Sequence, residues 1–175
     1  AHAHEVLLVR LLCGVYDHGG NPHLDSTGAK LSKKGQVEIV RATENELAAV
    51  ANLVYLSILY HQPLDSLTVV TDATKASVEK ESLRRLTNPQ YVSFLAKNEQ
   101  GFCGVVTAFN FNAGVINSGK KMLRIEDLFV KEEYRRSGIA QLLFEACSAY
   151  AAQNEIDTDT LNVLSNNESA VEIFK

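Results

Sequence analysis

Several features are scarce in this sequence, and each absence narrows the classes of protein to consider. No apolar run approaches the roughly 20 residues that a membrane-spanning helix needs. The most apolar stretch near the start, residues 6–15, is interrupted by Arg10 and precedes no small-residue cleavage site, so we do not interpret it as a signal peptide. The cysteines, Cys13, Cys103 and Cys147, are odd in number and match neither a zinc site nor a disulfide framework. That usage predicts reduced thiols in the cytoplasm.

Positive charge is also scarce. Lys and Arg number 17 against 21 Asp and Glu, which gives a formal net charge of −4. Binding to nucleic-acid phosphates usually needs a basic face, so this balance argues against nucleic acid as the main partner. It is compatible with a small cationic substrate. Four of the five histidines lie before residue 24, and their spacing indicates no metal site.

The remaining composition is that of one globular domain with an extension. The chain has 175 residues, and 46% of them are hydrophobic, which is enough for a core. It contains no internal repeat and no low-complexity tract. Residues 17–36 are rich in Gly, Asn, Asp, Ser and Lys, which favour turns and loops. We therefore predict an N-terminal extension over residues 1–35, made of a strand and a loop, and a domain over residues 36–175.

Within that domain the residue patterns predict an α+β fold. A strand is predicted at residues 37–43, and Thr43 with Glu46 forms a capping box for a helix that ends at Pro63. The later elements are a more polar helix (73–86), three antiparallel strands (91–97, 102–111 and 122–130), a long helix (138–154), a short strand (160–165) and a last helix from Asn167. This order predicts a mixed, mostly antiparallel central sheet flanked by helices, with a parallel crossover around the long helix.

The junction between the strand at 122–130 and the long helix is the strongest candidate for a binding site. The helix has apolar residues at helical spacing that predict one buried stripe: Ile139, Leu142, Leu143, Ala146 and Tyr150. Its first turn leaves amide groups unpaired at the positive end of the helix dipole, where an anion such as phosphate binds. Gly138 lets a ligand approach closely, and Arg135 and Arg136 add positive charge. The alternative is that Gly138 only permits tight packing and the arginines form a solvated turn.

These residues also carry a resemblance to a known family. Residues 135–140 resemble the Arg/Gln-x-x-Gly-x-Gly/Ala signature of the GNAT superfamily of acyl-CoA-dependent N-acetyltransferases. Residues 125–130 are similar to the fourth core strand of that family, particularly in the polyamine and diamine acetyltransferase branch. Residues 167–174 resemble the Asn-x-x-Ala-x-x-x-Tyr segment after its fifth strand. Three segments in the right order make the resemblance specific.

The resemblance implies a site for acetyl-CoA as co-substrate, with no metal. The strand would offer backbone groups to the pantetheine arm and the acetyl carbonyl, and the helix start would hold the diphosphate. The residues it assigns to cofactor binding are Leu128, Phe129 and Val130 on the strand, Arg135, Arg136, Ser137, Gly138, Ile139, Ala140 and Gln141 at the helix start, and Asn167 near the pantetheine or the thioester.

The resemblance also implies a catalytic base. An amine arrives protonated and must lose a proton before it attacks a thioester, and a carboxylate can accept that proton. Glu126 stands where the polyamine-type members carry a catalytic glutamate; the alternative is an ion pair with Arg124 or a solvated edge residue. Strand alternation predicts that Asp127 points to the opposite face, which makes it the weaker candidate unless the strand is bulged. A strand amide near Leu128 would donate to the oxyanion.

The sequence departs from the family at two positions. The tyrosine of the last helix, which protonates the leaving thiolate in many members, is Phe174 here, so water or another tyrosine such as Tyr134 would have to serve. The printed chain ends at Lys175, where the family continues with a turn and two strands. We expect the open sheet edge to be covered either by the segment before Gln36 or by a partner subunit in a homodimer. The alternative is that the segment before Gln36 is accessory.

Two functions follow from these observations. The first is transfer of an acetyl group to a primary amine of a small cationic molecule or a peptide. The alternative is a weakly active or inactive GNAT-like module that binds acyl-CoA. The segment that usually shapes the acceptor site, residues 59–81, carries both signs of charge: Asp65, Asp72, Glu79, Glu81, Lys75 and Lys80. A faint likeness of the first strand to histidine phosphatases fails because Leu11 replaces the nucleophilic histidine after Arg10.

Overall fold

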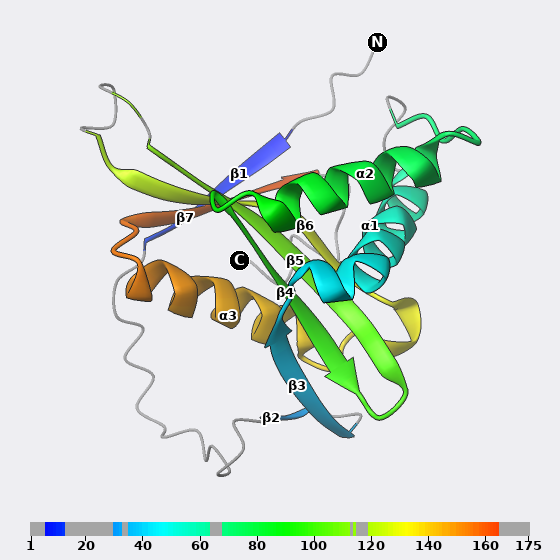
Figure 1. The fold of residues 1–175 in the computed structure, drawn as a ribbon. Helices are drawn as coiled ribbons and strands as arrows, with labels where there is room; N and C mark the ends of the chain where they lie inside the picture. Colours follow the sequence, from blue (N-terminus) through cyan, green and yellow to red (C-terminus); the bar gives the residue numbers. More distant parts are fainter. Residues whose placement is uncertain are drawn as a thin grey trace.

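A mixed sheet forms the centre of the molecule (Figure 1). The computed structural model describes residues 6–12, 30–32, 35–63, 68–112, 114 and 119–164. Within them, seven strands lie in the order β1-β7-β6-β5-β4-β3-β2. The strands are β1 (Val6–Leu12), β2 (Lys30–Ser32), β3 (Gly35–Arg41), β4 (Tyr91–Asn98), β5 (Gly101–Asn112), β6 (Lys121–Val130) and β7 (Thr158–Leu164). All neighbours are antiparallel except β6 and β7, which are parallel. The predicted α+β fold is confirmed.

In the described part of the chain, three α-helices cover the two faces of the sheet (Figure 1). Helices α1 (Leu47–His61) and α2 (Thr74–Thr87) lie on one face, and α3 (Ile139–Gln153) lies on the other. Because side chains alternate along a strand, Val105 packs with α1 and α2 whereas its neighbour Val106 packs with α3. The molecule therefore has two apolar cores, one on each side of the sheet.

The buried face of α3 differs in part from the predicted stripe. Its fully buried residues are Ile139, Leu143, Cys147 and Ala151. These residues follow an uninterrupted spacing of four, whereas the predicted Leu142, Ala146 and Tyr150 are only half-buried. The helix lies so close to β5 that a side chain on Gly104 would stand 3.1 Å from Leu143 Cδ1. That close approach sets which row of α3 is covered.

The predicted capping box is confirmed. Glu46 Oε2 accepts a hydrogen bond from the Thr43 backbone N–H at 2.9 Å, and Thr43 Oγ1 accepts one from the Asn45 N–H at 3.3 Å. These bonds satisfy donors that a helix start leaves open. They begin a short 3₁₀ turn (Glu44–Glu46) that leads into α1.

The N-terminal segment contributes a strand to the sheet. Strand β1 pairs antiparallel with β7 from Val6–Leu164 to Leu12–Thr158. The expectation that part of the segment before Gln36 lies at this sheet edge is therefore confirmed. Strand β2, which pairs with β3, lies inside the predicted loop and was not expected. The predicted last helix from Asn167 lies outside the described residues.

Candidate active site

A β-bulge interrupts β6 at the predicted catalytic residue. Across the β5–β6 pairing, Thr107 lies opposite Asp127 and Ala108 lies opposite Ile125. Glu126 is therefore an extra residue of β6 with no residue opposite it on β5. A bulge shifts the alternation of the residues that follow it. Asp127 consequently lies on the side of α1 and α2, where it contacts Arg85. The exception allowed for a bulged strand therefore applies, and Asp127 does not lie on the face that plain alternation predicts.

Glu126 is held by an arginine on its own strand. Arg124 Nε donates a hydrogen bond to Glu126 Oε1 at 2.6 Å, and the Glu126 side chain keeps 22% of its surface exposed. The Arg124 guanidinium also lies over the rings of Phe109 and Phe111, at 5.8 and 5.5 Å from their centroids. The ion pair considered as an alternative role for Glu126 is thus present, and its carboxylate still reaches solvent.

Strands β6 and β7 separate at this bulge. Their parallel pairing runs only from Met122–Thr158 to Ile125–Leu161. Beyond it, residues 126–130 of β6 have no partner on the β7 side within the described part of the chain. An open strand edge offers N–H and C=O groups to an extended ligand. Leu128, Phe129 and Val130, the predicted pantetheine contacts, lie along this open edge.

The turn between β6 and α3 ends in an open helix start. Gly138 immediately precedes α3 with φ 86°, a left-handed conformation that favours glycine. Among the described residues, no atom beyond its two chain neighbours lies within 4 Å of where a Gly138 side chain would begin, so tight packing in this part of the chain does not explain the glycine. The first α3 residues, Ile139, Ala140 and Gln141, have amides without an intrahelical acceptor. This arrangement fits an anion such as a diphosphate.

The two arginines of this turn have different roles. Arg135 Nε donates to the Val130 carbonyl at 3.1 Å, and its guanidinium stacks 4.0 Å from the centroid of the Tyr60 ring on α1. Arg136 is exposed, with a left-handed φ of 57°. The buried Ser137 hydroxyl donates to the Tyr134 carbonyl. The Arg135 and Ser137 side chains thus shape the turn, while Arg136 presents its charge to solvent.

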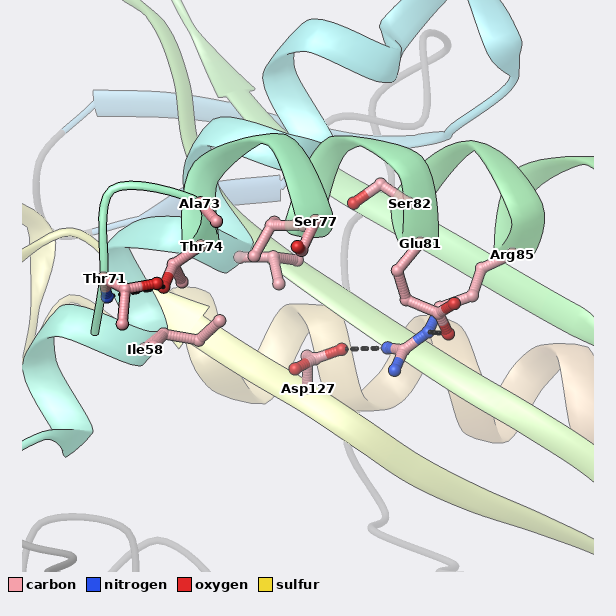
Figure 2. Close-up of a pocket in the computed structure, with 11 residues that line it drawn as sticks. Ile58, Thr71, Ala73, Thr74, Ser77, Glu81, Ser82, Arg85 and Asp127 are labelled. Carbon is pink, nitrogen blue, oxygen red and sulfur yellow. Dashed lines mark hydrogen bonds and ion pairs between the residues drawn. The ribbon is translucent and has the colours of Figure 1, made fainter. Parts of the chain in front are cut away.

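A cavity of about 360 Å³ lies between α1, α2 and β6 (Figure 2). Its wall combines apolar, hydroxyl and charged side chains. The apolar residues are Val54, Ile58, Ala73 and Val78, the hydroxyl residues are Thr71, Thr74, Ser77 and Ser82, and the charged residues are Glu81, Arg85 and Asp127. The cavity therefore lies next to the bulge and can take an amphipathic molecule.

Ion pairs join the charged residues of this cavity. Arg85 Nη1 donates to Asp127 Oδ2 at 2.6 Å, and Arg85 Nε donates to Glu81 Oε1 at 2.8 Å (Figure 2). Burial raises the pKa of the Asp127 carboxyl, although the adjacent Arg85 opposes this shift. Hydrogen bonds from Arg84, supported by Arg85, lower the pKa of Glu81 to about 2.

Sequence reasoning missed Arg85. Its spacing of four from Glu81 is a recognisable helical ion-pair signal. Its contact with Asp127 spans 42 positions of the sequence and has no local signal.

Three other residues were singled out in the sequence: Asn167, Phe174 and Tyr134. Asn167 and Phe174 lie outside the described residues. The hydroxyl of Tyr134, considered as a proton donor, donates to Gln100 Oε1 on the β4–β5 turn. That bond uses the proton that a general acid would deliver.

Two other features are absent from the described residues: a membrane-spanning helix and a metal site. In this part of the chain, no helix combines the length and hydropathy needed to cross a bilayer. The same residues contain no group of three or more His, Cys, Asp or Glu side chains placed to hold a metal ion.

Comparison with known proteins identifies the family. The model of the Acetyltransferase (GNAT) family matches residues 58–175, which is more than half of the chain. The chain belongs to the GNAT acetyltransferase family. Membership supports an acyltransferase activity, and GNAT acetyltransferases use acetyl-CoA as the acyl donor. A search of curated proteins found no match.

Solved GNAT structures share the fold at low sequence identity. An aminoglycoside acetyltransferase from an uncultured soil metagenomic sample, in complex with trehalose, has a TM-score of 0.63 and 19% identity, over 79% of this chain and 84% of that one. Ribosomal-protein-alanine N-acetyltransferase from Brucella melitensis biovar Abortus 2308 has a TM-score of 0.60 and 17% identity, over 79% and 87%. A predicted acetyltransferase from Clostridium acetobutylicum, solved with acetyl-CoA, has a TM-score of 0.64 and 11% identity, over 78% and 88%.

Proposed function

We propose that this GNAT protein is an N-acetyltransferase that moves an acetyl group from acetyl-CoA to a primary amine. The observation that carries the proposal is the separation of β6 from β7 at the Glu126 bulge, followed by the open start of α3 at Gly138. The open strand edge suits an extended pantetheine arm, and the helix start suits a diphosphate. The acetyl-CoA-bound relative from Clostridium acetobutylicum has the same fold and supports this interpretation.

The residues of this site would divide the binding of acetyl-CoA between backbone and side chains. Leu128, Phe129 and Val130 would hold the acyl arm through their backbone groups. The amides of residues 136–141 would hold the diphosphate, with Arg136 adding charge. We assign Arg135 to shaping this surface, because its side chain is engaged with Val130 and Tyr60. Asn167 keeps the role implied by the family resemblance.

Glu126 is the proposed base. Acetyl-CoA supplies an acyl group activated as a thioester, and the protein has to deliver an uncharged amine to it. The Glu126 carboxylate lies at the point where β6 and β7 separate and retains solvent contact, so it can accept the ammonium proton directly or through water. The amide of Leu128 would donate to the oxyanion that forms on attack. The cavity bounded by α1, α2 and Asp127 is the proposed acceptor site.

An assay for release of free coenzyme A tests the proposal. The full chain is incubated with acetyl-CoA and a panel of diamines, amino sugars, amino-acid amides and basic peptides. Amine-dependent release of thiol, with acetylated amine identified by mass spectrometry, is the expected result. Saturable binding of coenzyme A without release for any amine would instead favour the inactive binding module.

A further inference from the structure

The charges around the acceptor cavity are already paired within the protein. Asp127 is bound by Arg85 at 2.6 Å, Glu81 by Arg84 and Arg85 at 2.6 and 2.8 Å, and Glu126 by Arg124 at 2.6 Å. Three carboxylates thus face three guanidinium groups. A site for a polyamine needs carboxylates free to receive several ammonium groups, and none of these three carboxylates is unpaired.

We propose that Arg85 sets the acceptor specificity of this site by occupying the cation position against Asp127. The cavity then takes an acceptor with one ammonium group and uncharged hydroxyl or carbonyl groups, in preference to a polyamine. This inference rests on the proposed acetyltransferase function and names the class of acceptor for it. It narrows the small cationic acceptor that we expected from the charges of residues 59–81 and the acidic balance of the chain to one with a single ammonium group.

The position of Arg85 makes its displacement unfavourable. Its side chain is 21% exposed and that of Asp127 is 20% exposed, so both charges are largely removed from water. An incoming ammonium group that took Asp127 would leave the guanidinium without this partner in a partly desolvated site, which is costly. Arg84, its neighbour on α2, is 52% exposed, and among the described residues it forms its ion pair with Glu81 and none with Asp127.

The uncharged part of the cavity wall fits the proposed acceptor. Thr71, Thr74, Ser77 and Ser82 bring hydroxyl groups to the cavity from α2 and the turn before it (Figure 2). Arg85 Nη2 has no hydrogen-bond partner among the described residues, so it remains a donor for a carbonyl or hydroxyl oxygen. Val54, Ile58 and Val78 supply an apolar wall. These groups match a polar carbon skeleton that carries one amine.

Calorimetric titration in the presence of coenzyme A measures this preference without requiring turnover. The probes are glucosamine and glycinamide, each with one ammonium group, and 1,4-diaminobutane, with two. We expect the wild-type protein to bind at least one monoamine more tightly than the diamine. The two monoamines distinguish an amino-sugar skeleton from a peptide-like one.

Substitution of Arg85 tests its role. In Arg85→Gln, Asp127 becomes available to a second ammonium group, so the affinity ratio of diamine to monoamine should rise about tenfold, the size of one charge-assisted contact. Arg85→Lys keeps the cation and should keep the wild-type ratio. Arg84→Gln removes the same charge outside the cavity and is the matched control, expected to leave the ratio unchanged.

A second variant keeps the test decisive if Arg85→Gln does not fold. The double variant Arg85→Gln/Asp127→Asn replaces the ion pair with two neutral amides and should bind the diamine no better than wild type. A wild-type protein that prefers the diamine, or an Arg85→Gln variant with an unchanged ratio, would overturn the inference. Absence of acetyl transfer with normal amine binding would refute the proposed function and leave these affinity ratios as the test of Arg85.

Discussion

Adjacent carboxylates on β6 have different environments. Glu126 is the extra residue of the bulge and pairs with Arg124 on its own strand, whereas Asp127 regains a partner on β5 and pairs with Arg85 on α2. Burial raises the pKa of Asp127, but its Oδ2 atom is already bound by a guanidinium. Because a guanidinium binds both carboxylates, their positions separate the proposed roles: Glu126 lies where β6 and β7 separate and stays the proposed base, whereas we propose that Asp127 acts through the shape and charge of the cavity.

Replacement of each carboxylate by its amide separates these roles. Glu126→Gln keeps the shape but cannot accept a proton, so turnover with the best amine should fall by about 100-fold or more. Coenzyme A affinity should stay unchanged. Asp127→Asn, the matched control, should mainly raise the KM for the amine. Steady-state kinetics and calorimetry measure both quantities, and unaltered turnover of Glu126→Gln across pH would exclude it as the base.

Gly138 combines a left-handed backbone with open space in front of it. Asparagine tolerates this conformation better than other residues with a Cβ, so Gly138→Asn separates backbone strain from obstruction of the site. We expect Gly138→Asn to keep most of the stability yet lose coenzyme A affinity, because its side chain enters the proposed diphosphate path. Gly138→Val should lose both. Calorimetry and thermal unfolding distinguish the two effects, and normal affinity in Gly138→Asn would contradict the assignment.

At the scale of the elements, the position of α3 depends on its close approach to β5. A side chain on Gly104 would stand 3.1 Å from both Leu143 Cδ1 and the Phe129 carbonyl oxygen, and 3.4 Å from Ile139 Cγ2. The carbonyl belongs to β6 and can move little, whereas Leu143 can shift. The absence of a Cβ at Gly104 thus keeps the start of α3 against the sheet and beside the open edge of β6.

Gly104→Ala should therefore destabilise the protein by about 1–3 kcal/mol through overpacking. Urea denaturation measures this loss as a lower midpoint. Leu143→Val removes one of the crowding atoms, so the double variant should be less destabilised than the sum of the two single changes. Additive losses would show that Leu143 does not crowd a residue at position 104.

Helix α2 is joined to its surroundings by ion pairs that depend on pH. Arg84 lowers the pKa of Glu81 from its usual 4.5 to about 2, so the folded state favours the ionised carboxyl. A depressed pKa stabilises the fold above pH 4.5, and this stabilisation is lost as the pH falls from about 4.5 through about 2. The Glu81 side chain is 41% exposed, so the effect is modest.

Comparison of the wild-type protein with Glu81→Gln checks this dependence. At pH 7 the variant should unfold at a lower urea concentration, because its amide cannot form the ion pairs. The difference should shrink between pH 4.5 and 3, as the wild-type carboxyl becomes protonated on unfolding. A difference that stays constant over this range would contradict the lowered pKa.

At the scale of the whole molecule, the two edges of β6 differ in how much of their backbone is paired with a neighbouring strand. On one side it pairs with β5 along most of its length, and on the other it pairs with β7 over four residue pairs only. The outer edge of β7 is covered by β1 over seven residue pairs. The part of the sheet next to the proposed cofactor site therefore depends on the N-terminal strand.

Removal of residues 1–12 should lower the free energy of unfolding, because β7 loses most of its backbone pairing. Hydrogen exchange should accelerate at β7 while the amides of β4 and β5, on the far side of β6, stay protected. Urea denaturation and exchange mass spectrometry measure these effects. An unchanged midpoint with full protection of β7 would show that β1 contributes nothing to the sheet.

The sequence alone was sufficient to predict local features, such as where helices and strands form. Hydrophobic periodicity predicted the strands and helices, the Thr43–Glu46 pattern predicted the helix start, and residues 135–140 indicated the family. Such signals depend on neighbouring residues and on the backbone preference of glycine at Gly138. Apart from Asn167, the candidate cofactor residues lie between Leu128 and Gln141, so a local pattern was enough to propose them.

The tertiary structure alone decided how distant side chains meet. The bulge at Glu126 depends on the register between β5 and β6, and it reverses the face that alternation predicts for Asp127. The contacts of Arg85 with Asp127 and of Arg135 with Tyr60 join residues far apart in the chain. Strand register and helix placement are set by the packing of the whole molecule, so no local pattern could specify the charges of the acceptor cavity.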